Sequence, residues 1–120
     1  MFAALLASLL ATAPLLPWHI LPDEEEARVQ IVAAAYSLSP EQGALLRAIR
    51  RAENGAPHLA FGVADRRCNT YHKQALWTAN TIRRRYTGDL TAFARRWCPD
   101  NWRVWLKNVR FFMRKQGFKK

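Results

Sequence analysis

Apolar residues recur three and four positions apart along most of this chain, which is the spacing that places side chains on one face of an α-helix. One such stripe covers residues 71–86 and stops before Gly88. Another covers residues 102–113 and consists of Trp102, Trp105, Leu106, Val109, Phe112 and Met113. The spacing predicts a mainly α-helical domain with few other kinds of element.

Capping residues and glycines indicate where the predicted helices begin and end. Residues 39–42, Ser-Pro-Glu-Gln, form a capping box that predicts a helix from Pro40, and Asn54-Gly55 predicts its end. An earlier helix is expected after Pro22 and through residue 36. Asp89 is expected to cap a short helix over residues 90–97, and a last helix begins near residues 100–101.

Residues 56–69 have no lasting helical period and contain Pro57 and Gly62. We expect a loop here, with a short strand or hairpin around residues 61–63. A loop of this length in a small helical domain is often functional.

Charge is distributed unevenly along the chain. The first 26 residues have four acidic and no basic residues, so residues 27–120 carry all 19 basic residues against five acidic ones, roughly +14. This excess favours a polyanionic partner: a nucleic acid, an anionic membrane surface or a cell-wall polymer.

The N-terminal segment is apolar from residue 2 to residue 16, and Ala11-Thr12-Ala13 has the small-x-small pattern of a signal-peptidase site. Pro14, Pro17 and other residues interrupt the run before residue 21, which disfavours a membrane span. We predict a signal peptide or N-terminal anchor over 1–22, export to the periplasm, cell envelope or medium, and a single domain over 23–120. Membrane attachment through residues 2–21 and a buried helix stay open.

The two cysteines, Cys68 and Cys98, predict one disulfide in an exported chain and buried thiols in a cytosolic one. Cys68 and His72 are one helical turn apart and could bind zinc with Cys98, but no fourth ligand stands out. We expect no metal and no cofactor.

Glu53 is the candidate catalytic residue. It shares a helix face with Leu45, Leu46 and Ile49 and lies in the last turn, where burial and the helix dipole both disfavour a carboxylate. A raised pKa suits a general acid that protonates a glycosidic oxygen. The alternative is a structural Glu53 that pairs with one of two arginines, Arg50 or Arg84.

Residues 48–55, Ala-Ile-Arg-Arg-Ala-Glu-Asn-Gly, resemble the Glu-Ser-Gly helix end of the lysozyme-like lytic transglycosylases. Residues 61–63 stand where that family has Gly-Leu-Met-Gln, and residues 79–97 are similar to its helix, Gly-Asp-Leu and Ala-Tyr-Asn-Ala-Gly run. The resemblance covers about residues 44–112. Trp97 falls on the family's Tyr, and Cys98-Pro99-Asp100 replaces Asn-Ala-Gly.

The resemblance implies a small lysozyme-like helical domain with an irregular or β segment after the catalytic helix. It implies cleavage of the β-1,4 bond between N-acetylmuramic acid and N-acetylglucosamine in peptidoglycan glycan strands, by a monomer with Glu53 as general acid. The substrate-binding residues would be Phe61, Gly62, Val63, Tyr86 and Trp97, although aromatic residues at helical spacing are more often part of a core.

A lysozyme would need a second carboxylate, for which Asp65, Asp89 and Asp100 are candidates. Because Asp89 is an expected helix cap and the others lie in loops, we favour the transglycosylase route to a 1,6-anhydro product. There are two alternatives. One is a basic module that binds nucleic acid or the cell wall without catalysis, although the predicted export argues against nucleic acid. The other is an inactive lysozyme-like domain that binds the wall.

Overall fold

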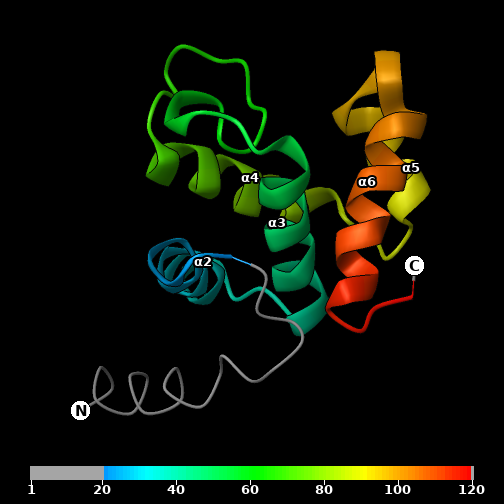
Figure 1. The fold of residues 1–120 in the computed structure, drawn as a ribbon, viewed down its shortest axis with the longest axis horizontal. Helices are drawn as coiled ribbons and strands as arrows, with labels where there is room; N and C mark the ends of the chain where they lie inside the picture. Colours follow the sequence, from blue (N-terminus) through cyan, green and yellow to red (C-terminus); the bar gives the residue numbers. More distant parts are fainter. Residues whose placement is uncertain (1–20, 120) are drawn as a thin grey trace.

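The computed structural model describes residues 21–119, which form a mainly helical, compact fold (Figure 1). Five α-helices and two short 3-10 helices follow one another in this part of the chain: α2 (Asp23–Ala35), α3 (Pro40–Glu53), η2 (Pro57–Leu59), α4 (Tyr71–Arg85), α5 (Leu90–Trp97), η3 (Pro99–Asn101) and α6 (Trp102–Lys115). The described residues contain no strand, so the strand or hairpin predicted around residues 61–63 is wrong. These residues follow η2 and form a turn and irregular backbone instead.

Helix α3 is the central element (Figure 1). Its predicted capping box is confirmed: Ser39 Oγ accepts from the N–H of Gln42 at 3.1 Å, and Gln42 Oε1 accepts from the N–H of Ser39 at 2.8 Å. Asn54 ends the helix in the left-handed region, with φ 45°. Helix α6 packs on one side of α3, and α2 and α4 pack on the other.

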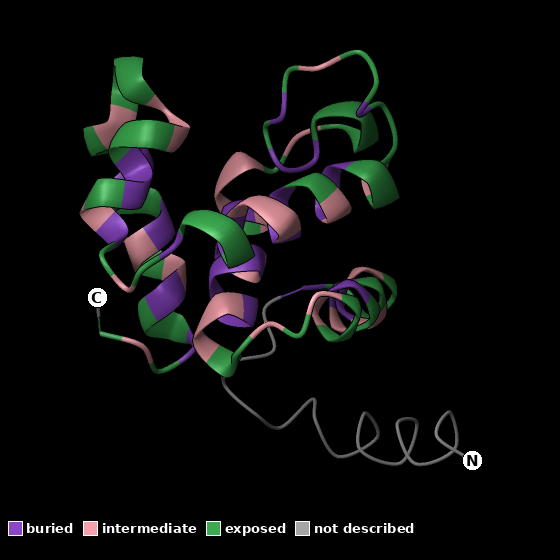
Figure 2. Ribbon diagram, turned by 180° about the vertical axis from the view of Figure 1, so that it is seen from behind, coloured by how far each residue is buried: buried purple, intermediate pink, exposed green. Residues whose placement is uncertain are grey.

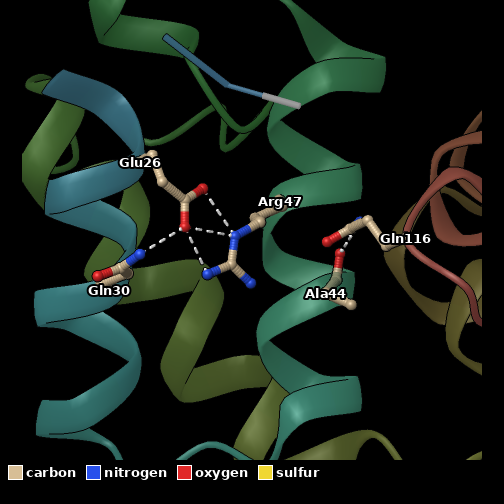
Figure 3. A network of polar contacts seen from close by, with 5 residues as sticks. All are labelled: Glu26, Gln30, Ala44, Arg47 and Gln116. Carbon is tan, nitrogen blue, oxygen red and sulfur yellow. Dashed lines mark hydrogen bonds and ion pairs between the residues drawn. The ribbon is translucent and has the colours of Figure 1, made fainter. Parts of the chain in front are cut away.

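Ion pairs join α2 to α3, as Figure 3 shows for Glu26 and Arg47. The Glu26 side chain is fully buried, and its carboxylate accepts from Nε and Nη2 of Arg47 at 2.6–2.9 Å and from Gln30 at 3.0 Å. Glu25 pairs with Arg50 at 2.9 Å. The acidic cluster at the start of α2 therefore binds the basic side chains of α3.

Aromatic side chains pack between α5 and α6. Asp89 caps α5 as predicted, because its carboxylate accepts from the N–H of Ala92 at 3.0 Å. The rings of Phe93, Trp97 and Trp105 lie 5.7–6.3 Å apart, centroid to centroid. In Figure 2, buried positions recur along α3 and α6, as the apolar spacing requires.

The disulfide predicted between Cys68 and Cys98 is not formed: both cysteines are free. The Cys68 thiol donates to the carbonyl of Lys73 in the first turn of α4 at 3.2 Å, while Cys98 is the C-cap of α5. Burial raises the pKa of the Cys68 thiol, which disfavours the reactive thiolate.

The predicted signal peptide or anchor over 1–22 falls almost entirely on residues 1–20, which lie outside the described part of the chain. Within residues 21–119, no helix has the length and apolar character that a membrane crossing requires.

Candidate functional site

The loop after α3 is held by Gln74, a fully buried side chain of α4. Its Oε1 accepts from the N–H groups of Phe61 and Val63, both at 3.1 Å. Its Nε2 lies 2.6–3.0 Å from the carbonyl oxygens of His58, Val63 and Cys68. One amide thus binds three parts of the loop. No sequence pattern indicates this role, since a single Gln within a helical pattern is common.

Arg50 binds the same loop from α3. Its Nη1 donates to the carbonyl oxygens of Gly55 and Ala60 at 3.4 and 3.3 Å, while its Nε donates to Glu25. The chain is also tightly folded here, because a Cβ added to Gly55 would lie 2.4 Å from the Leu59 carbonyl oxygen. The loop path is therefore fixed by backbone contacts at both ends.

The loop brings Gly62 against the carboxyl group of Glu53. Gly62 has φ +81°, and a Cβ built on it would lie 2.5 Å from Glu53 Cδ and 2.7 Å from each carboxyl oxygen. Real Cβ atoms do not approach other atoms so closely, so any side chain at this position would displace the Glu53 carboxyl, and the positive φ also favours glycine. The Glu53 carboxyl therefore rests directly on the backbone of the loop.

Trp105 of α6 contacts the other side of Glu53, with its Nε1–H donating to Oε2 at 3.0 Å. The Glu53 side chain is half-buried, and this burial raises its pKa above the ordinary value, against the opposing effect of the Trp105 hydrogen bond. The predicted direction of the shift is confirmed. The alternative partners fail, because Arg50 pairs with Glu25 and no ion pair joins Glu53 to Arg84.

A groove with a volume of about 910 Å³ is lined in part by Gly62, the residue on which this carboxyl rests. Its walls come from the 62–68 loop, α4 and α5, together with Tyr36. Gly62 is the link: it lines the groove and contacts the Glu53 carboxyl, although Glu53 itself does not line the groove. The basic residues of the lining are Arg67, Lys73, Arg84, Arg85 and Arg96.

The predicted substrate-binding residues divide into two groups. Gly62, Val63 and Trp97 line the groove. Phe61 is fully buried, with its ring 5.4 Å from that of Tyr71. Tyr86 is also buried and donates its hydroxyl hydrogen to Glu41. Phe61 and Tyr86 are thus core residues, and of the two only Tyr86 has the helical spacing that favours a core position.

None of the three candidate second carboxylates lines the groove. Asp65 pairs with Arg67 at 2.9 Å, and the hydrogen bonds from Arg67 lower the pKa of Asp65 to about 2. Asp89 caps α5, and Asp100 is exposed in η3. Two acidic groups of the described chain contact residues that line the groove: Glu53 contacts Gly62, and Asp65 pairs with Arg67. Of these two, only Glu53 has a raised pKa.

Within residues 21–119, no three His, Cys, Asp or Glu side chains are placed to hold a metal ion together. The chain matches no protein-family model, no curated protein and no solved structure. Its function must therefore be argued from Glu53, the two residues that contact its carboxyl, and the groove.

Proposed function

We propose that this protein cleaves the β-1,4 bond between N-acetylmuramic acid and N-acetylglucosamine in peptidoglycan, with Glu53 as general acid and then general base. One observation carries the proposal: a half-buried carboxyl with a raised pKa lies between Gly62 and Trp105, and Gly62 also lines a groove. A carboxyl group that keeps its proton near neutral pH can donate it to a leaving oxygen.

The proposed reaction has two steps. Glu53 donates its proton to the glycosidic oxygen while the carbonyl oxygen of the muramoyl acetamido group bonds to C1, and the bond to the leaving sugar breaks. The Glu53 carboxylate then accepts the proton of the muramoyl 6-hydroxyl, whose oxygen displaces the acetamido oxygen at C1. The product is a 1,6-anhydro sugar, and no water is consumed.

The lining of the groove supports this route over a two-carboxylate hydrolysis. A second carboxylate on the opposite sugar face has no supporting candidate in the described chain, because Asp65 is paired with Arg67, Asp89 caps α5, and Asp100 is exposed in η3 away from the groove lining. Trp77 and Trp97 offer ring faces on which sugars can stack. These features suit an exported, lysozyme-like domain that acts as a monomer on glycan strands.

The test is product release from purified cell walls by the full-length chain, followed by mass spectrometry. We expect muropeptides that are lighter by one water than hydrolysis products. Glu53→Gln should lower the rate by about 10²–10⁴-fold, the contribution of a general acid. Glu24→Gln makes the same change at an exposed position of α2 and should keep full activity.

Two results would overturn the proposal. One is the absence of any soluble product from the folded wild-type protein. The other is equal rates for the wild type and Glu53→Gln, which would mean that the carboxyl transfers no proton.

A binding module without catalysis is the second candidate, and a hollow on α6 favours it. This hollow combines Trp102 and Phe111 with a basic lining made by Arg103, Lys107, Arg110 and Arg114. Such a surface could bind an anionic polymer. Co-sedimentation with walls, with no product and no change on Glu53→Gln, would favour this function over cleavage, and salt-sensitive binding of nucleic acid would favour its nucleic-acid form.

A further inference from the structure

Four of the basic side chains that line the groove have no acidic partner within residues 21–119. Arg67 is paired with Asp65, but no ion pair joins a carboxylate to Lys73, Arg84, Arg85 or Arg96. The first three of these belong to α4, and Arg96 belongs to α5. The charges therefore face the groove from two of its walls and are available to an anionic ligand.

The groove also has an aromatic part. Trp77 is 41% exposed, and Trp97 is half-buried and stacked on Phe93 with a centroid distance of 5.7 Å. Both line the groove. A ligand that suits the whole groove must combine faces for stacking with negative charge.

The glycan backbone alone meets only half of this requirement. While the lactyl groups are amide-bonded to peptides, the sugars themselves carry no charge, so they can stack on the tryptophan rings but leave the arginine side chains without a partner. In peptidoglycan, the negative charge near the sugars is on the carboxylates of the stem peptides, which are joined to the muramoyl lactyl groups. Arginine is well suited to carboxylates because its planar guanidinium can donate two parallel hydrogen bonds.

We propose that the groove selects glycan strands that carry stem peptides, with Arg84, Arg85 and Arg96 binding the peptide carboxylates. The inference rests on the proposed function, because it takes the groove beside Glu53 as the substrate site. It adds a requirement that the bond cleavage itself does not impose, namely a charged group next to the sugar.

The experiment measures binding and cleavage of two substrates made from one wall preparation. One is peptidoglycan strands with their stem peptides. The other is the same strands after an amidase has removed the peptides and the lactyl carboxylates that this exposes have been converted to neutral methylamides. Binding is measured with full-length Glu53→Gln, so that the substrate stays intact, at 20 and 300 mM NaCl. We expect tighter binding of the peptide-bearing strands, and we expect salt to weaken only that preference.

Arg96→Gln has a matched control on the same helix. The Arg95 guanidinium lies over the Trp102 ring at 4.6 Å and does not line the groove. We expect Arg96→Gln to weaken binding of peptide-bearing strands about two- to fivefold, the range of one solvent-exposed ion pair. Arg84→Gln with Arg85→Gln should weaken it further, and Arg95→Gln should leave it unchanged.

Equal binding of both substrates, or equal effects of Arg96→Gln and Arg95→Gln, would overturn the inference. So would binding that follows the content of phosphodiester polymers in the walls instead of their peptides. The proposed function can fail separately: if Glu53→Gln prefers peptide-bearing strands but the wild type releases no product, the selectivity stands and the cleavage does not. If the wild type cleaves both substrates equally well, the cleavage stands and the selectivity does not.

Discussion

The two sides of α3 are held by different kinds of interaction. On the side of α2, α4 and the loop, buried polar groups supplement the apolar core: Glu26 binds Arg47, and Gln74 binds the backbone of the loop. On the side of α5 and α6, aromatic rings pack together near Glu53, and Trp105 supplies a hydrogen-bond donor, while Gln116 binds the Ala44 carbonyl nearer the start of α3. Glu53, at the end of α3, is contacted from both sides.

The two sides of α3 therefore have different roles in placing Glu53. Hydrogen bonds are directional, so the polar side fixes the loop backbone and with it the position of Gly62 beside Glu53. Apolar packing is not directional, and the aromatic side removes water from the carboxyl without fixing the loop. We therefore expect changes on the polar side to alter geometry and stability, and changes on the aromatic side to alter the pKa of Glu53.

The largest expected effect comes from Arg47→Met, which leaves the carboxylate of Glu26 buried without its cation. Breaking a buried ion pair in this way costs about 3–5 kcal/mol in the free energy of unfolding. Urea unfolding at pH 7 measures the loss. The control Arg67→Gln breaks the exposed pair with Asp65 and should leave the unfolding midpoint close to that of the wild type. A loss no larger than that of the control would contradict this account of the polar side.

Gln74→Met should have the next largest effect, because it leaves buried backbone groups of the loop without partners. We expect a loss of about 2–3 kcal/mol. Hydrogen exchange should speed up first at the N–H groups of Phe61 and Val63, whereas the α6 amides keep their protection. A uniform rise in exchange over the whole chain would show that the two sides are not separable.

Two glycines with positive φ give a smaller and more local comparison. Gly62→Ala and Gly88→Ala both force alanine into the left-handed region, at about 1–2 kcal/mol each. Only Gly62 has a neighbour, the Glu53 carboxyl, where the new Cβ would lie; Gly88 has open space. The end of the Glu53 side chain can move away from the new Cβ, so we expect Gly62→Ala and Gly88→Ala to lose similar stability. Wall cleavage should fall only for Gly62→Ala, because only there is the carboxyl displaced. Equal cleavage by the two variants would show that the contact between Gly62 and Glu53 does not position the carboxyl.

The smallest expected effect is a gain in stability. Because the pKa of Glu53 is raised in the folded state, its contribution to stability is complete below the ordinary glutamate pKa and is lost as the pH rises through the folded value. At pH 7, Glu53→Gln should therefore be more stable than the wild type by about 1 kcal/mol or less in the free energy of unfolding, and should unfold at a higher temperature. The difference should shrink below about pH 4. Thermal unfolding at both pH values measures this, and a destabilised variant at pH 7 would contradict it.

Local features of the fold were predictable from the sequence. The capping box at Ser39 and the cap at Asp89 depend on residues three positions apart, and both form as expected. The burial of Glu53 followed from its place on an apolar helix face. These predictions succeed because a helix fixes the relation between near neighbours.

Contacts between distant residues were not predictable in the same way. Trp105 meets Glu53 across 52 positions, and Glu26 meets Arg47 across 21. The disulfide was expected from the even number of cysteines in an exported chain. That number does not say how far apart Cys68 and Cys98 lie in the fold, and the Cys68 thiol instead donates a hydrogen bond to the start of α4. The role of Gln74 depends on the loop path, which no periodicity specifies.

The central claim is that the Glu53 carboxyl is held partly out of water between Gly62 and Trp105. An NMR pH titration of its carboxyl carbon tests this most directly, with Trp105→Phe as the comparison. We expect a midpoint above the ordinary glutamate value of about 4.3. Trp105→Phe should move it higher still, because the lost N–H donor stabilises the ionised form. A wild-type midpoint at or below the ordinary value would contradict the account.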